Sequence, residues 1–133
     1  MKIFLDTNIF LDLIFKREDY NEAVLIFNAI EKQIFEGFVL DITLLNIDYV
    51  AKKQVKDIRA FLSLINKNMS VIGANNEIID EALHLDNNDL EDNVQYISAK
   101  NIGCTLIVSN DKNFYSQNVE KYNSVEFVEK YIK

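Results

Sequence analysis

Four short apolar runs lie along the chain, separated by segments with helical periodicity. The runs cover residues 2–5, 38–40, 70–72 and 104–108 and are largely continuous rather than alternating in hydrophobicity. Continuous runs of this length are typical of strands that are buried on both faces of a parallel sheet. We therefore expect a strand at each of these positions.

The segments between the runs repeat apolar residues at three- and four-residue steps, which is the spacing of one helical face. Ala23, Phe27, Ile30 and Ile34 are an example, and Gly37 is expected to end their helix. The pattern predicts helices at residues 20–36, 42–53, 55–67, 76–85 and 90–101, with an earlier helix starting close to residue 9. An edge strand at 124–127 and a helical turn at 128–132 complete the prediction.

Strands that alternate with helices indicate an α/β protein with right-handed crossovers. We expect three layers, α/β/α, around a central parallel sheet of four to five strands. The chain has 133 residues, of which 49% are hydrophobic, and this is enough for one buried core. Residues 1–133 are therefore predicted to form a single domain.

Cysteine content and the first residues bear on where the protein resides. Cys104 is the only cysteine, so an internal disulfide is excluded, and we expect a small residue buried in a strand. Asp6 interrupts the stretch where a signal peptide needs apolar residues, and no apolar run approaches a membrane span. The prediction is a soluble, cytoplasmic protein with no membrane partner.

The chain carries a formal net charge of -7. Binding to phosphate backbones depends on clustered Lys and Arg, so this charge argues against a generally basic surface that holds polyanions. Any contact with nucleic acid must therefore be local.

Asp6 and Asp111 directly end or closely follow the apolar runs at 2–5 and 104–108. Sites in open parallel sheets form beyond the carboxyl ends of strands, where the direction of winding reverses. If the first and fourth strands are neighbours, as in a 3-2-1-4-5 order, the two side chains share one crevice. Asp92 would join them from the first turn of the helix at 90–101, whose dipole favours an ionised carboxylate.

Three carboxylates held close together repel one another, which raises their pKa values and destabilises the fold unless a cation neutralises them. Oxygen ligands favour Mg²⁺ or Mn²⁺, and His84, the only histidine, cannot supply a zinc cluster. Taken singly, Asp6 could be a helix cap, Asp92 a first-turn charge and Asp111 a turn residue. Most other acids, including Asp12, are interpreted as solvated helix charges.

Three motifs follow one another at suitable spacing. They are Leu5-Asp6-Thr7-Asn8 with Asp12, Asp89-Leu90-Glu91-Asp92 through Ala99, and Val108-Ser109-Asn110-Asp111 with Phe114. Together they resemble the PIN-domain family, best known as the toxin ribonucleases of VapBC-type toxin-antitoxin pairs. The resemblance spans nearly the whole chain and implies a PIN-like sheet of order 3-2-1-4-5. It also implies a metal-dependent endoribonuclease that cleaves RNA phosphodiester bonds as the toxin of a type II pair.

In that family picture, Asp6, Asp92 and Asp111 are catalytic and coordinate Mg²⁺ or Mn²⁺ directly or through water. Residues that support this shell would be Thr7, Asn8, Asn46 and Asp89. The implied partners are an RNA substrate, an antitoxin protein and a second copy of the chain in a homodimer.

Asn46 departs from the family pattern, since many members carry glutamate at this position. Asparagine keeps one carbonyl oxygen but no charge, so it should bind a metal or its water more weakly. Asp48 is no substitute, because two residues along a helix turn the side chain by roughly 200°. The alternative prediction is therefore a non-catalytic or weakly active PIN-like module that binds RNA or protein.

Arg17 and Lys112 lie close in sequence to the acidic motifs. Their positively charged side chains are therefore the candidates for contact with the substrate. Lys52, Lys56 and Arg59 would form a basic stripe if one helix ran through this segment. We expect a helix break between them, which favours a solvated charged face.

Two other α/β families begin with an Asp after the first strand. Haloacid-dehalogenase-like phosphatases need a second Asp two residues later, where this chain has Asn8. Receiver-like signalling domains need a phosphoacceptor Asp after the middle strand and a late Lys, and the sequence lacks that pattern.

Overall fold

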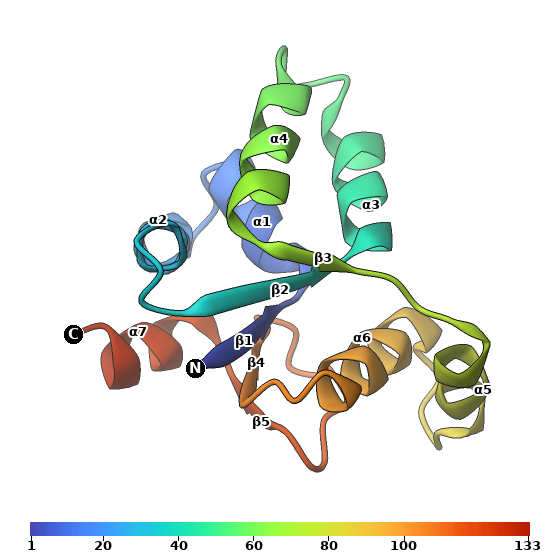
Figure 1. Ribbon diagram of the computed structural model, residues 1–133. Helices are drawn as coiled ribbons and strands as arrows, with labels where there is room; N and C mark the ends of the chain where they lie inside the picture. Colours follow the sequence, from blue (N-terminus) through green and yellow to red (C-terminus); the bar gives the residue numbers. More distant parts are fainter.

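The computed structural model describes residues 1–133 and contains one five-stranded parallel sheet (Figure 1). The strands are β1 (Lys2–Leu5), β2 (Glu36–Leu40), β3 (Ser70–Ile72), β4 (Leu106–Val108) and β5 (Glu120–Tyr122). Their order is β3-β2-β1-β4-β5, and every neighbouring pair is parallel. The predicted fold class and the 3-2-1-4-5 order are confirmed.

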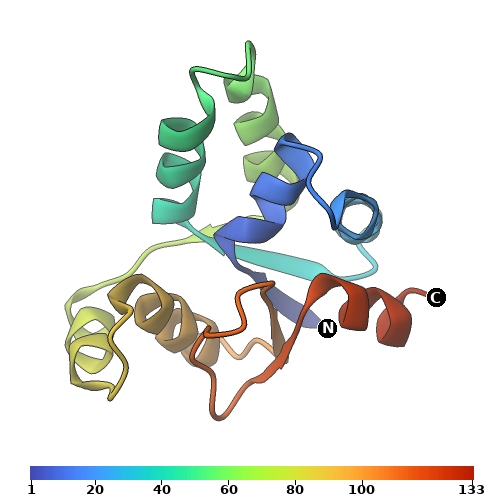
Figure 2. The same cartoon turned by 180° about the vertical axis from the view of Figure 1, so that it is seen from behind.

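Helices cover both faces of the sheet and give three layers (Figures 1 and 2). One face carries α1 (Thr7–Ile14), α2 (Tyr20–Glu31), α3 (Asp41–Ala51), α4 (Ile58–Asn68) and α7 (Ser124–Tyr131). The other face carries α5 (Asn76–His84) and α6 (Leu90–Asn101). None of these helices has both the length and the apolar character needed to cross a membrane.

The two faces of the sheet have separate hydrophobic cores, because alternate residues of a strand point to opposite sides. Ile3 and Leu5 of β1 belong to the larger core, beneath α1 and α2. Phe4, between them, belongs to the core beneath α5 and α6. All three side chains are fully buried, so β1 is covered on both sides, as its continuous apolar run predicts.

Two predicted boundaries around β2 are wrong. The second helix ends at Glu31, not at residue 36, and Gln33 then takes a positive φ of 62°. Gly37 does not end a helix but lies inside β2. A Cβ atom at Gly37 would lie 2.9 Å from Cδ1 of Ile30 and 3.0 Å from Cε of Met69. The glycine is there because α2 and the end of α4 pack closely against the strand.

The predicted edge strand at 124–127 is also wrong, since this segment begins α7. Asn123 and Glu126 form a capping box, in which each side chain accepts a hydrogen bond from the other residue's backbone amide (2.8 and 2.9 Å). The edge strand is instead β5, which pairs with β4. Smaller differences are that α4 starts at Ile58 and that β4 starts at Leu106.

Candidate acidic site at the carboxyl ends of β1 and β4

Asp6 directly follows β1 and is 4% exposed. Three donors fix its carboxylate: the amide of Thr7 at 2.7 Å, Nε2 of Gln95 at 3.0 Å and Oγ of Ser109 at 2.8 Å. Burial raises the pKa of Asp6, the three hydrogen bonds oppose that rise, and the negative charge of Asp111 adds to it. The side chain is thus held in one orientation at the end of the central strand.

Asp92 lies in the first turn of α6 and is 6% exposed. The side chain of Asp89 caps this helix and accepts a 3.1 Å hydrogen bond from the Asp92 amide. Oδ2 of Asp92 is buried and has no hydrogen-bond partner. Burial raises the pKa of Asp92 to about 8, with further contributions from the negative charges of Asp6, Asp89, Asp111 and Glu91.

Asp111 follows β4 in a turn and is only partly buried. Its carboxylate accepts a 2.9 Å hydrogen bond from the amide of Asn113, as is usual for an Asp turn. Its own amide donates to Oγ of Ser109 at 3.1 Å. The same hydroxyl donates to Asp6, so Ser109 links the two strand ends.

The topology therefore brings Asp6, Asp92 and Asp111 together in one acidic cluster near the ends of β1 and β4, where their charges influence one another. No three His, Cys, Asp or Glu side chains are drawn together around a single point as a finished metal site requires. The donor set nevertheless fits a hard divalent cation, since it consists of carboxylates and includes the unpartnered Oδ2 of Asp92.

Thr7 and Asn8, two of the predicted supporting residues, begin α1. Oγ1 of Thr7 lies 3.1 Å from Oγ1 of Thr43, which is fully buried in α3. This contact ties the helix after β1 to the helix after β2, directly beside Asp6. Asn8 is half-buried in the first turn.

The interpretation of Asp12 as a solvated charge is wrong. Its side chain is 8% exposed and accepts a 2.7 Å hydrogen bond from Nδ2 of Asn110. Oδ1 of Asn110 in turn accepts from the amide and hydroxyl of Ser124, at 2.9 and 3.0 Å. Asp12 thus helps to hold the loop after β4 against α1 and the start of α7.

Asn46 lies on α3 and donates a hydrogen bond from its side-chain amide to Oε1 of Glu91 on α6. Glu91 is an acid next to the candidate site that sequence reasoning did not single out. Burial raises its pKa, and so do the negative charges of Asp6 and Asp89. In the sequence, only its position directly before Asp92 points to Glu91. That position alone does not separate a site residue from a first-turn helix charge.

The two basic residues predicted to contact the substrate, Arg17 and Lys112, lie in different places. Lys112 lines a hollow of about 460 Å³ together with Ser109 and Asp111. Arg17 is exposed, and its guanidinium lies 5.4 Å from the ring centroid of Phe15. Neither side chain forms an ion pair with the three central carboxylates.

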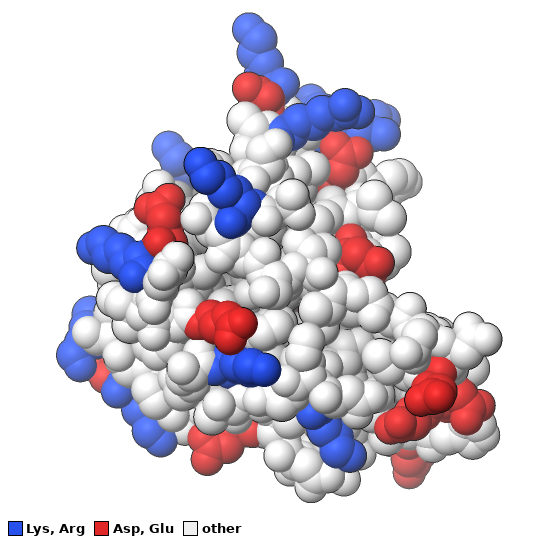
Figure 3. Space-filling view, viewed as in Figure 1, with Lys and Arg blue, Asp and Glu red and all other residues white.

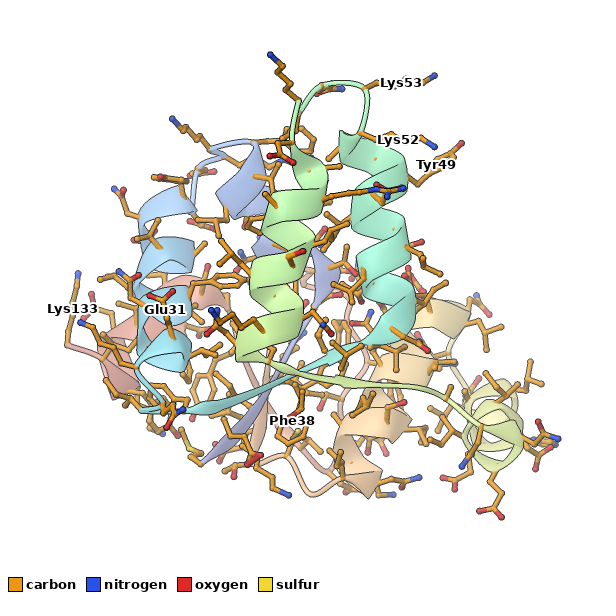
Figure 4. The ribbon with its side chains drawn as sticks, turned by 45° about the horizontal axis from the view of Figure 1, so that its top comes forward. Glu31, Phe38, Tyr49, Lys52, Lys53 and Lys133 are labelled. Carbon is orange, nitrogen blue, oxygen red and sulfur yellow. The ribbon has the colours of Figure 1, made fainter.

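The chain also carries a local basic patch despite its negative net charge. Helix α3 ends at Ala51 and α4 starts at Ile58, so the expected helix break is confirmed and no single-helix stripe exists. The basic side chains instead gather where α3 and α4 are joined (Figure 3), and all of them are exposed. They are Lys52, Lys53, Lys56 and Arg59. Figure 4 shows Lys52 and Lys53 pointing away from the body of the protein.

Comparison with known proteins identifies the family. The sequence pattern of the PIN domain matches residues 2–113. Ribonuclease VapC1 of Aquifex aeolicus (strain VF5) is 30% identical over 98% of this chain and 95% of its own length.

Solved structures with a similar fold come from toxin-antitoxin complexes. One is VapBC2 from Rickettsia felis bound to a promoter DNA fragment, with a TM-score of 0.67 and 17% identity over 92% of this chain and 98% of that one. Another is a toxin-antitoxin complex from Klebsiella pneumoniae, with a TM-score of 0.67 and 19% identity over 92% of this chain and 97% of that one. These likenesses show the same fold, and the two sequence matches show that the chain belongs to the PIN-domain family.

Proposed function

We propose that this protein is a metal-dependent endoribonuclease in which Asp6, Asp92 and Asp111 hold Mg²⁺ or Mn²⁺. The observation that carries the proposal is the buried, unpartnered Oδ2 of Asp92 beside other carboxylates. A buried polar atom without a partner is costly, and a cation would both pair with it and relieve the repulsion. The 30% identity to a relative named as a ribonuclease supports RNA as the substrate.

The carboxylates of Asp6 and Asp111 differ in how firmly they are held. Asp6 is fixed by its three donors, so it can present an oxygen in a constant direction. Asp111 lies in a more exposed turn and can adjust when a cation or substrate arrives. A divalent cation bound here would activate water and neutralise charge on the phosphoryl oxygens of the RNA backbone.

The test is an RNA cleavage assay with Mn²⁺ and a panel of unstructured and hairpin RNAs. We expect cleavage that stops with a chelator and falls by at least about 100-fold in Asp6→Asn, because one removed ligand charge weakens both metal binding and transition-state stabilisation. Asp86→Asn is the matched control, since Asp86 is an exposed acid in the loop before α6. Cleavage that survives Asp6→Asn would contradict the proposal.

An antitoxin is the proposed protein partner, because the structural relatives were solved as toxin-antitoxin complexes. An antitoxin would block the acidic cluster by offering an Arg to its carboxylates. The test is co-expression with the product of the neighbouring gene, followed by the cleavage assay on the purified complex. Cleavage by that complex at the rate of the free chain would count against this partner.

One observation favours a second candidate function, a binding module without catalysis: position 46 holds an asparagine and not an acid. In that case RNA binds to the chain, as measured by fluorescence anisotropy, and stays intact at every Mn²⁺ concentration. Mn²⁺-dependent cleavage in the same samples excludes this alternative.

A further inference from the structure

The hydrogen bond between Asn46 and Glu91 joins two helices that are 45 residues apart in the sequence. Position 46 is where the chain departs from the pattern expected of an acidic site, and its side chain meets a carboxylate that the predicted site did not include. The pair lines a hollow of about 510 Å³ that is otherwise largely apolar, with Leu40, Leu90 and Val94 among its walls. Glu91 is therefore open to ions and to substrate.

Helix α3 is held in place by buried side chains close to the acidic cluster. Thr43 and Ile47 are fully buried, and Thr43 contacts Thr7 next to Asp6. Asn46 lies three residues after Thr43, on the same side of the helix. The amide of Asn46 thus reaches Glu91 from a helix that the core holds in place.

The carboxylate of Glu91 lies at the edge of the acidic cluster. Glu91 directly precedes Asp92 in the first turn of α6, and its charge interacts with the charges of Asp6 and Asp92. Asp92 is 94% buried, and its Oδ2 has no hydrogen-bond partner, an independent observation that a bound cation would explain.

We propose that Glu91 supplies the fourth carboxylate of the metal site, from α6, where the acid expected on α3 is absent, and that Asn46 is a positioning residue that orients Glu91 by its amide. This inference rests on the proposed metal-dependent function. It assigns Glu91 contact with the cation, directly or through a bound water. It also explains how an asparagine at position 46 is compatible with a complete site.

A purely structural role for the pair makes a different prediction. If the hydrogen bond only fastened α3 to α6, Glu91→Gln would leave metal binding unchanged, because the glutamine carbonyl still accepts from Asn46. If Glu91 serves the cation, the same variant removes one negative charge from the site. The two roles therefore separate on metal affinity and not on stability.

The experiment is Mn²⁺ titration of the full chain, with free Mn²⁺ followed by electron paramagnetic resonance and folding checked by circular dichroism. We expect Glu91→Gln to weaken Mn²⁺ binding by about 10-fold or more, and Asn46→Ala to weaken it by about 10-fold. Glu31→Gln is the matched control, because Glu31 is an exposed glutamate at the end of α2 (Figure 4). The double variant Asn46→Glu/Glu91→Gln moves the carboxylate from position 91 to position 46. It should recover Mn²⁺ affinity to within about threefold of wild type.

The outcomes separate the role of Glu91 from the proposed metal-dependent function. Unchanged Mn²⁺ affinity in Glu91→Gln, together with loss in Asp6→Asn, overturns the role of Glu91 and leaves the proposed function standing. Wild-type chain that binds no Mn²⁺ overturns both. Weakened binding in Glu91→Gln with recovery in the double variant supports the assignment. Weakened binding without recovery contradicts the claim that positions 46 and 91 face the same cation.

Discussion

Ser109 donates a 2.8 Å hydrogen bond from its hydroxyl to Oδ2 of Asp6, across the boundary between β4 and β1. The same hydroxyl accepts the backbone amide of Asp111 at 3.1 Å. Ser109 is 2% exposed, so bulk water cannot replace these contacts. One serine therefore sets the orientation of one acid and the backbone of another.

Ser109→Ala should lower the cleavage rate by about 10-fold, because partners that orient a ligand are worth 10- to 100-fold in affinity or activity. It should also destabilise the fold by about 1–2 kcal/mol, since the Asp111 amide loses its acceptor. Cleavage kinetics and urea unfolding measure the two effects. Ser63→Ala, in an exposed position on α4, is the control. Unchanged kinetics in Ser109→Ala would show that Asp6 needs no such support.

Asp92 should make the metal-free protein less stable as the pH rises. Its pKa is about 8 in the folded chain, against about 3.9 for an ordinary Asp. The folded state therefore holds a proton that the unfolded state has lost, and this contribution to stability declines from about pH 4 to about pH 8. Thermal unfolding in a chelator should show a fall in Tm over this range that is smaller in Asp92→Asn.

Addition of Mn²⁺ at pH 8 should then raise the Tm of the wild-type chain, because the cation binds the folded state alone. The increase should be largely absent in Asp92→Asn. If the Tm of the two chains in chelator depends on pH in the same way, the pKa of Asp92 is not raised in the folded protein.

Cys104 should resist alkylation in the folded protein. Its side chain is 7% exposed, and burial raises the pKa of the thiol to about 12, so the reactive thiolate is scarce at pH 8. Iodoacetamide labelling followed by mass spectrometry should give little product in native buffer and complete labelling in denaturant. Rapid labelling under native conditions would show that the region around β4 opens readily.

Gly37→Ala should destabilise the protein by about 1–3 kcal/mol, the usual cost of an extra carbon in a filled core. The new Cβ would lie 2.9 Å from Cδ1 of Ile30, so the side chain must shift. Ile30→Val deletes that atom, and the double variant should lose less stability than the sum of the two single changes. Strict additivity in urea unfolding would contradict this contact.

The positions of the first four strands were predictable because strands buried on both faces need continuous apolar runs, whereas the sheet order followed from the resemblance to the PIN-domain family. Ile3, Phe4 and Leu5 show this directly, since consecutive side chains enter different cores. The ends of elements were less predictable. Gly37 has the character of a helix terminator in the sequence, and only the close approach of Ile30 explains its place inside β2.

The C-terminal segment was misassigned for a similar reason. Val125 and Phe127 alternate with polar residues, a pattern that a strand and a short helix share. The capping box of Asn123 and Glu126 decides in favour of the helix. Local hydrogen bonds of this kind carry as much weight as hydrophobic spacing over so few residues.

The acids at the ends of β1 and β4 could be predicted because parallel strands place their carboxyl ends at one edge. The burial of Asp12 and the contact of Glu91 with Asn46 could not, since each depends on a partner far away in the sequence. Those partners are Asn110, 98 residues from Asp12, and Asn46, 45 residues from Glu91.

Asp6, Asp92 and Asp111 are proposed to form a metal site at which RNA is cleaved. The most direct measurement is the rate of RNA cleavage by wild-type chain and Asp6→Asn across a Mn²⁺ titration, with chelator as the zero point. Cleavage should rise with Mn²⁺ in the wild type and be at least about 100-fold slower in the variant. Equal rates in the two chains, or full activity in chelator, would contradict the proposed site.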